Sequence, residues 1–260
     1  MSEFKRKYGP WALVAGASQG LGEAFAEALA RRGMHLILVA RRADKLDQVA
    51  QRLHDNYGIL TKTVQIDLGD FQSLKKALTQ IEDPIGLLLY NAAYSPIGAF
   101  EQISEKDLEQ IVNVNIRTPL LLTKFLSDGM IERQKGGIVL MSSLAGLQGS
   151  PKIATYAASK AFNSILAEGL WKELMKNNIH VLATCAGAIS TPGYETAKGN
   201  KTAPGTLTAS QIAESTLKSL GRGPTVIPGL TNKVAVFVMR RLLPARWRIA
   251  IMNNNTKDLT

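Results

Sequence analysis

The sequence is poor in cysteine and histidine, the residues that most often form disulfides and transition-metal sites. It has one cysteine, Cys185, and three histidines, His35, His54 and His180, in 260 residues. A single cysteine excludes an internal disulfide and a cysteine metal cluster. We therefore expect no metal site, and the cysteine content agrees with a reducing compartment such as the cytoplasm.

Long apolar runs are missing as well. No uncharged apolar stretch reaches about 18 residues, so a membrane-spanning helix is not expected. Residues 1–11 are rich in charge, and no signal-peptide pattern follows them. Hydrophobic residues make up 45% of the chain and charged residues 20%, as in ordinary globular proteins with a full core. Because no repeat or linker is visible, residues 1–260 are predicted to form one domain.

Acidic residues are scarce at the C-terminal end. The chain has a net charge of +10, and Asp258 is the only acid after Lys218. Residues 229–260 are therefore predicted to form a basic C-terminal extension. Such charge suits nucleic acid, a membrane surface or an acidic ligand, or it is a solvated face. We expect no nucleic-acid contact.

Residues 234–251 of this extension combine large apolar side chains with arginines, as interfacial helices do. Pro244 interrupts the pattern, which favours an element packed over a pocket or a neighbouring subunit. Contact with a membrane surface, and a location peripheral to one, is the alternative interpretation.

Apolar runs alternate with amphipathic helical patterns along the whole chain. Strands are expected at 11–15, 36–40, 63–66, 85–90, 138–141, 179–185 and 225–227, with helices at 21–32, 44–56, 71–81, 104–133, 155–176 and 209–220. Such alternation favours a parallel sheet with helices on both faces. The predicted fold class is an α/β protein with a doubly wound sheet of about seven strands in three αβα layers.

Residues 187–208 break this alternation, being rich in Gly, Thr, Pro and Lys. A loop of this length in a compact domain is usually functional. It follows the carboxyl end of a predicted strand, the edge at which open α/β sheets bind ligands. We therefore predict a lid over a substrate site.

The stretch GASQGLG, residues 16–22, fits two motifs. Its first five residues match G-x-S-x-G, the nucleophile elbow of serine hydrolases. An elbow needs an oxyanion loop from an earlier strand and a histidine in a late loop. Ser18 instead follows the first strand, and His35 and His180 begin predicted strands at the opposite edge of the sheet. The hydrolase interpretation is therefore disfavoured.

The same stretch forms a glycine-rich turn between a strand and a helix. Glycines allow a sharp turn and a close approach of backbone to ligand, and the free amides of a helix N-terminus favour a pyrophosphate. We predict a dinucleotide-binding loop. Its contacts are Gly16, Ser18, Gln19, Gly20, Leu21 and Gly22.

The end of the second predicted strand indicates which dinucleotide binds. An acid there would bind the ribose 2′-hydroxyl of NAD, whereas an arginine suits the 2′-phosphate of NADP. The sequence reads Ala40-Arg41-Arg42, with the first acid at Asp44. We therefore predict NADP(H), with Arg41 as the leading contact and NAD(H) as a possible substitute. Alternatively, both arginines are surface charges that begin a helix.

Tyr156 and Lys160 are four residues apart on a predicted helix and so share one face. A cation beside a tyrosine stabilises the tyrosinate, which would lower its pKa into the range useful for a general acid/base. Ser143 ends the fifth predicted strand, where its hydroxyl could bind a carbonyl oxygen. Ser142 is adjacent, and either serine could be structural.

In this order, with Asp67, Asn91-Ala92 and Asn115 between the glycine turn and Ser143, the chain resembles the short-chain dehydrogenase/reductase family from about Trp11 to Thr191. The resemblance implies a Rossmann-like sheet with strand order 3-2-1-4-5-6-7 and an NADP-preferring enzyme. It implies that Tyr156 is the acid/base, that Lys160 lowers its pKa and binds the nicotinamide ribose, and that Ser143 holds the substrate oxygen. Asn115 would kink its helix and anchor a proton-relay water.

The resemblance also implies further cofactor contacts. Asp67 would contact adenine, Asn91 would stabilise the sheet beside the cofactor, and Thr191 would contact the nicotinamide carboxamide. Leu68, Ala92, Gly187 and Ile189 complete the predicted set. Ala15, Tyr90, Ala93 and Ala186 depart from the residues usual in the family at those places.

The predicted substrate pocket is mostly apolar. Its residues are Tyr94, Leu144, Leu147, Gln148, Ile153, Ile189 and Tyr194. We expect a hydrophobic carbonyl or alcohol as substrate and reduction by NADPH as the reaction. By analogy with the family, a homodimer or homotetramer would form through the helices at 104–133 and 155–176. The alternatives are a non-catalytic NADP-binding sensor or scaffold, and a basic nucleic-acid or membrane binder.

Overall fold

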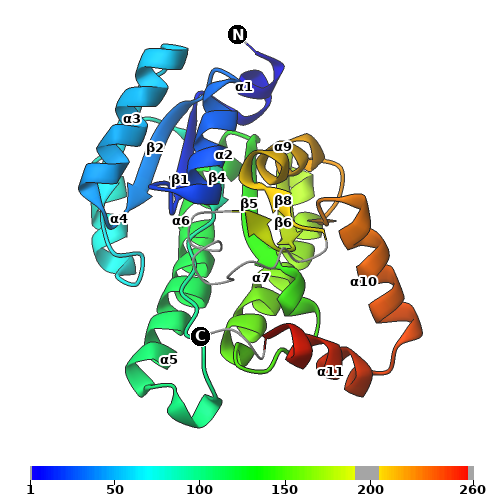
Figure 1. Cartoon of the computed structure of the whole chain (residues 1–260). Coiled ribbons are helices and arrows are strands. Elements are labelled where there is room, and N and C mark those ends of the chain that lie inside the picture. The colour runs from blue at the N-terminus through cyan, green and yellow to red at the C-terminus, as the bar shows by residue number, and fades with distance from the viewer. Residues whose placement is uncertain (1, 191–204, 257–260) are drawn as a thin grey trace.

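The computed structural model describes residues 2–190 and 205–256, whose helices and strands alternate (Figure 1). The elements are α1 (Glu3–Tyr8), β1 (Trp11–Ala15), α2 (Gly20–Ala30), β2 (His35–Ala40), α3 (Ala43–Tyr57), β3 (Thr61–Gln65), α4 (Phe71–Thr79), β4 (Ile85–Tyr90), α5 (Glu105–Val112), α6 (Thr118–Glu132), β5 (Gly136–Ser143), α7 (Ala154–Leu174), β6 (Ile179–Ala186), β7 (Ile189–Ser190), β8 (Leu207–Thr208), α9 (Ala209–Ser219), β9 (Thr225–Val226), α10 (Leu230–Leu242) and α11 (Ala245–Thr256).

Seven strands form one parallel sheet in the order β3-β2-β1-β4-β5-β6-β9. This order is the predicted 3-2-1-4-5-6-7, because β9 is the seventh strand of this sheet along the chain. The chain reverses its winding direction at β1 and β4, which lie side by side. The predicted fold class is confirmed, and ligands of such sheets bind at the carboxyl ends beside this reversal.

Two apolar cores lie on opposite faces of the sheet. Ala12 and Val14 of β1 belong to the core that contains residues of α2, α3 and α9. Leu13 and Ala15 belong to the other core, with residues of α4, α6 and α7. Because successive side chains of a strand point to opposite faces, a strand buried throughout can serve both cores. This arrangement produces the three layers.

The structure differs from the sequence-based elements in three places. The helix expected at 104–133 is divided by a π-helical turn, Asn113–Arg117, between α5 and α6. The chain from 187 to 208, expected to be a loop, contains β7 and β8, which pair in parallel. The short α1 was not predicted, because only one of its six residues, Tyr8, is buried and no amphipathic period develops.

The C-terminal helices α10 and α11 form an arm beside the sheet, at the right of Figure 1. Among the described residues of α10, only Asn232 is buried. In α11, Ile249 lies close to Gly149 in the connection between β5 and α7. The predicted division into one domain, a lid at 187–208 and an extension at 229–260 stays a prediction.

Candidate active site

The glycine turn after β1 is shaped for close backbone approach. Gly16 and Gly20 have φ angles of +83° and +59°, a region in which side chains are strained. A Cβ atom on Gly22 would lie 1.8 Å from the carbonyl oxygen of Gly16, so only glycine fits there. The turn therefore presents bare backbone at the carboxyl end of β1.

The first turn of α2 has backbone amides that are available as hydrogen-bond donors. Gln19 precedes the helix in an extended conformation and, among the described residues, makes no capping hydrogen bond with its side chain. The first amides of a helix have no partners within the helix and attract anions. Together with the glycine turn, this N-terminus fits the pyrophosphate of a dinucleotide.

The two arginines after β2 make different interactions. Arg42 Nη2 donates to Ser18 Oγ at 3.3 Å. The hydrogen bond to Asp107 raises the pKa of the Tyr94 phenol after β4, and the charge of Arg41 acts in the opposite direction. The choice of Arg41 as the leading cofactor contact stays a prediction, and Arg42 is a second candidate that the doubled arginine also offered.

The residues expected near adenine and the sheet lie at the same edge. Asn91 Nδ2 donates to the Gly16 carbonyl oxygen at 3.3 Å, and Ala92 N donates to that of Ala15 at 3.0 Å. Asp67 Oδ1 accepts from Gly69 N at 2.8 Å and so shapes the turn after β3. Leu68 beside it is buried. The predicted cofactor residues of the first four strands therefore converge.

Ser143, Tyr156 and Lys160 meet at the carboxyl end of β5. The Ser143 and Tyr156 side chains share a hydrogen bond. Lys160 Nζ lies 5.5 Å from the centre of the Tyr156 ring and donates to the Met141 carbonyl oxygen at 2.9 Å. The connection after β5 packs closely on α7, because its residue Gly146 has no side chain. A Cβ atom there would lie 2.7 Å from the α7 backbone. Hydroxyl, phenol and ammonium thus form one cluster.

Burial determines how two members of this cluster titrate. It raises the pKa of the Tyr156 phenol, and the hydrogen bond with Ser143 acts in the opposite direction. It lowers the pKa of Lys160 to about 8. The expectation that Lys160 lowers the pKa of Tyr156 stays a prediction.

The choice between Ser142 and Ser143 follows from the strand. Adjacent residues point to opposite faces, and Ser142 is turned into α7. Its hydroxyl donates to the Lys160 carbonyl oxygen at 2.8 Å and accepts from Ser164 Oγ at 2.8 Å. Ser142 thus fixes β5 against α7, and Ser143 is the serine beside the phenol.

Asn115 lies fully buried in the π-helical turn and ties three segments together. Its Oδ1 accepts from Tyr94 N at 2.7 Å. Its Nδ2 donates to the Tyr94 carbonyl oxygen at 2.8 Å and to Ser159 Oγ at 3.0 Å. Its own carbonyl oxygen accepts from Asn163 Nδ2 at 3.2 Å, which links the turn to α7.

Comparison with known proteins identifies the family. Residues 10–201 match the family model described as short chain dehydrogenase. The chain belongs to the short-chain dehydrogenase family. This membership confirms the resemblance seen in the sequence and the expectation of an oxidoreductase.

Individual relatives extend this result. The chain is 36% identical over 231 residues to a very-long-chain 3-oxoacyl-CoA reductase of Coccidioides immitis (strain RS), covering 85% of this chain and 64% of that protein. It resembles a solved 7β-hydroxysteroid dehydrogenase with a TM-score of 0.90 and 26% identity, over 97% of this chain and 100% of that one. A short-chain dehydrogenase from Sphingobium yanoikuyae, solved in complex with NADPH, gives a TM-score of 0.78 and 29% identity over 95% and 94%.

Tyr90, one of the departures from the usual short-chain dehydrogenase residues, has a structural explanation. It is buried, and its hydroxyl donates to the Val114 carbonyl oxygen in the π-helical turn at 2.6 Å. Burial raises the pKa of this phenol. Tyr90 therefore acts as a neutral donor that anchors the turn carrying Asn115 to the sheet.

All of the predicted substrate residues except Tyr194 belong to the described part of the chain. Leu144, Leu147, Gln148 and Ile153 line the partly exposed connection from β5 to α7, and Ile189 is on β7. Tyr94 directs its hydroxyl to Asp107 Oδ1 at 2.5 Å. Gly187 follows β6 and packs against Asn232. Thr191, Tyr194 and most of the predicted lid lie outside the described residues.

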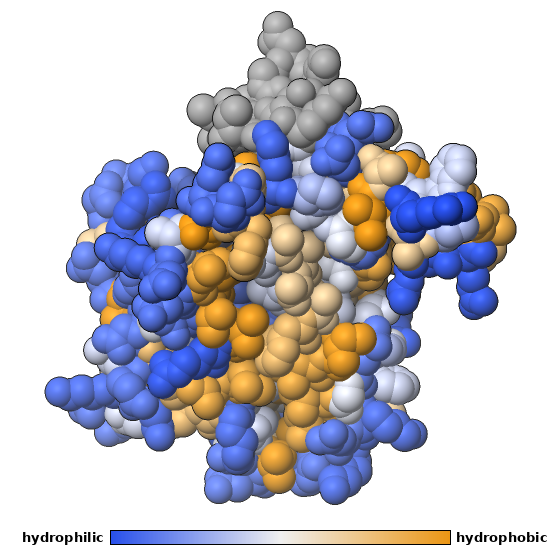
Figure 2. All heavy atoms as spheres, turned by 90° about the horizontal axis from the view of Figure 1, so that it is seen from below, coloured by the Kyte–Doolittle hydropathy of each residue, from blue (hydrophilic) through white to orange (hydrophobic). Residues whose placement is uncertain are grey.

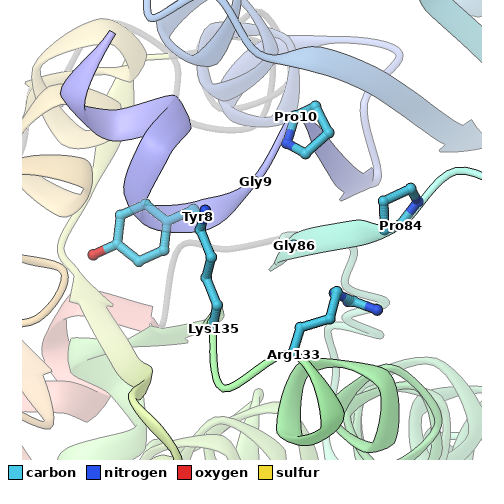
Figure 3. A pocket seen from close by; sticks show the side chains of 7 residues that line it. All are labelled: Tyr8, Gly9, Pro10, Pro84, Gly86, Arg133 and Lys135. Carbon is cyan, nitrogen blue, oxygen red and sulfur yellow. The ribbon is translucent and has the colours of Figure 1, made fainter. Parts of the chain in front are cut away.

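Two cavities lie away from the phenol. One of about 240 Å³ is lined by Gly98, Phe100, Ile103, Pro151, Lys152, Ala154 and Thr155, none of which was predicted. Another of about 110 Å³ is lined by Tyr8, Gly9, Pro10, Pro84, Gly86, Arg133 and Lys135 (Figure 3). The latter residues precede or begin β1, β4 and β5, so this cavity is at the opposite edge of the sheet from Ser143. Neither cavity contains the Ser143–Tyr156–Lys160 cluster.

Proposed function

We propose that this short-chain dehydrogenase reduces a ketone on a hydrophobic small molecule with NADPH, and that the reaction is reversible. The observation that carries the proposal is the contact of Ser143, Tyr156 and Lys160 at the sheet edge where the glycine turn also lies. NADPH supplies the hydride when it is bound. The residues of the chain have to hold the ketone oxygen and deliver a proton to it.

Each member of the cluster has a distinct role in this scheme. The Ser143 hydroxyl donates a hydrogen bond to the substrate oxygen, and the Tyr156 phenol donates the proton. A tyrosine phenol is protonated at neutral pH, which is the state that proton donation requires, and burial of Tyr156 favours that state further. Lys160, with a pKa of about 8, is mostly charged there and stabilises the tyrosinate left behind. Asn115 anchors the water that returns the proton.

The cofactor would lie along the glycine turn. We assign its contacts to the predicted residues: Gly16, Ser18, Gln19, Gly20, Leu21, Gly22, Arg41, Asp67, Leu68, Asn91, Ala92, Tyr156, Lys160, Gly187, Ile189 and Thr191. The Arg42–Ser18 contact supports a second guanidinium at the 2′-phosphate. Two arginines that precede the first acid, Asp44, favour NADPH over NADH, and a similar structure carries NADPH.

The substrate class follows from the apolar residues between β5 and α7. Leu144 and Leu147 offer apolar surface one turn from Ser143. Relatives named for hydroxysteroids and for very-long-chain 3-oxoacyl-CoA support a bulky hydrophobic ketone as the substrate.

The test is NADPH consumption with a panel of steroid, acyl and aromatic ketones, and the reverse reaction with the alcohols, each with NADPH and NADH. Wild type should turn over at least one ketone and prefer NADPH. The Tyr156→Phe variant should still bind NADPH, because the other proposed cofactor contacts remain, and should lose about a thousandfold or more in turnover. If both proteins bind NADPH and neither turns over any substrate, the result contradicts the proposal and favours the sensor or scaffold alternative.

We also infer that the protein is a homodimer or homotetramer. Val112, Leu120 and Ile165 are exposed on α5, α6 and α7, the helices predicted to pair. Figure 2 shows apolar side chains at the centre of the face seen from below, with hydrophilic residues around them. Light scattering should give a multiple of 28.2 kDa. A mass equal to one chain would contradict the inference.

The arm formed by α10 and α11 supports contact with an anionic membrane surface. Val234, Phe237 and Trp247 are exposed there among arginines, and no acid occurs between residues 229 and 256. In the described part of the chain, no helix is long and apolar enough to cross a bilayer. A truncation before Lys233 should lose flotation with anionic vesicles. Unchanged flotation would contradict this contact, and a cytoplasmic location stays a prediction.

A further inference from the structure

The one buried residue of α10 in the described part of the chain is polar. Asn232 is 5% exposed, whereas Leu230 and Phe237 of the same helix are 78% and 62% exposed. Burying an amide costs free energy unless it is hydrogen-bonded, so its contacts indicate its purpose.

The Asn232 side chain holds two segments that are distant in sequence. Its Nδ2 donates to the carbonyl oxygens of Gly205 and Pro228, each at 3.0 Å. Gly205 lies just before β8, and Pro228 leads into α10. One amide therefore fixes the start of the arm to the chain entering β8.

Three glycines leave room for this amide. A Cβ on Gly187 would lie 3.0 Å from Asn232 Nδ2, and its three nearest heavy atoms all belong to Asn232. A Cβ on Gly205 would lie 2.3 Å from Asn232 Oδ1, and one on Gly229 would lie 3.4 Å from Nδ2. The chain after β6, the chain before β8 and the start of α10 thus converge on Asn232.

The two ends of the segment between β6 and α9 pair with each other near Asn232. Ile189–Ser190 pairs with Leu207–Thr208, and Leu207 N donates to the Ala188 carbonyl oxygen at 3.1 Å. Gly187 and Ile189 are the residues that we assign to the nicotinamide. Asn232 therefore lies directly behind the backbone proposed to hold the reacting end of the cofactor.

We propose that Asn232 is a positioning residue for hydride transfer. By packing against Gly187 and holding Gly205, it sets the backbone from Gly187 to Ile189 and couples the arm to the nicotinamide site. The proposal rests on the proposed function for the identity of the ligand at Gly187. The coupling itself is a property of the chain and is measurable through NADPH binding alone.

The test compares Asn232→Ala and Asn232→Leu with Thr231→Ala, an exposed neighbour on the same helix. Leucine keeps a buried side chain of similar size and removes both hydrogen bonds. Both Asn232 variants should raise the Kd for NADPH and lower kcat by about tenfold each, because the backbone from Gly187 to Ile189 is no longer held in position for the nicotinamide. The KM for the ketone should stay within about twofold of wild type, because the pocket between β5 and α7 is untouched. Thr231→Ala should match wild type.

A double-mutant cycle makes the test independent of folding defects. Gly187→Ala should weaken NADPH binding in the wild-type background and much less in Asn232→Ala, where the added methyl group has room. Additive effects, or Asn232 variants that are less resistant to urea yet unchanged in Kd and kcat, would overturn the proposal. If wild type binds NADPH without turnover, the proposed function fails, and the cycle on Kd still decides the coupling.

Discussion

The sheet and the C-terminal arm use apolar residues in opposite ways. Every residue of β1 and of β4 is buried, and the side chains divide between two cores. In α10, by contrast, apolar residues such as Leu230 and Phe237 face outward, while an asparagine is inside. Burial on the sheet stabilises the fold, whereas the arm's apolar residues contribute little to it and are free to contact something else.

The largest expected difference between the two regions is in stability. Leu89→Ala in β4 removes a fully buried side chain and should lower the free energy of unfolding by about 2–5 kcal/mol. Phe237→Ala in α10 should change it by less than about 0.5 kcal/mol, because the ring is exposed. Urea unfolding measures both. Equal losses would mean that the arm is part of the folding core.

The next prediction concerns Lys160, a buried basic residue of α7. Burial lowers the pKa of Lys160 to about 8 from 10.5, so between these values the unfolded chain binds more protons and stability rises with pH. From about pH 7.5 to about pH 9.5 the contribution should grow by about 2 kcal/mol. Lys160→Met should lack this rise in urea unfolding. The buried tyrosines are common to both proteins, so the difference isolates Lys160. The prediction is wrong if wild type and variant follow the same pH dependence.

The preference for NADPH over NADH should depend on the arginines that follow β2 and not on those of the arm. Arg42→Ala should weaken NADPH binding about tenfold and leave NADH binding unchanged, because only NADPH carries the 2′-phosphate. Arg241→Ala, which removes an equal charge from α10, should alter neither Kd. Fluorescence titration gives both constants. A similar loss in the two variants would indicate a non-specific charge effect.

The smallest effect is expected at the arm's own surface. Arg241→Gln should weaken binding to anionic vesicles by about 1 kcal/mol, or about fivefold, without affecting turnover of a soluble ketone. Lys176→Gln, an exposed charge near the amino ends of the strands, is the matched control and should bind vesicles like wild type. Cosedimentation measures this. Equal losses in both variants would assign membrane binding to net charge and not to the arm.

The sequence was sufficient to predict a structural feature where a single physical rule determines it. Apolar runs such as Trp11–Ala15 predicted buried strands, and their order brought Gly16, Asn91 and Ser143 to one edge. The sequence was insufficient where contacts between distant segments contribute to the structure. In the π-helical turn, the Val114 carbonyl oxygen accepts a hydrogen bond from the Tyr90 hydroxyl on β4. No local sequence pattern indicates such a contact.

The electrostatics of the site were the other limit. The spacing of Tyr156 and Lys160 carries no information about the desolvation that raises the pKa of Tyr156, or about the Met141 carbonyl oxygen that accepts from Lys160 Nζ. Likewise, the sequence does not show that Arg42 and not Arg41 donates to Ser18. Family membership was recognisable from the sequence because the order of the motifs does not depend on these electrostatic details.

The most direct test of the account is a single-turnover measurement of NADPH oxidation by wild type and Tyr156→Phe, with a ketone selected from the panel. The account predicts that both proteins bind NADPH and that, with each protein saturated with it, the rate of hydride transfer is lower by about a thousandfold or more in the variant. Equal rates in the two proteins would contradict the assignment of Tyr156 as the proton donor, and with it the proposed reaction at the Ser143–Tyr156–Lys160 cluster.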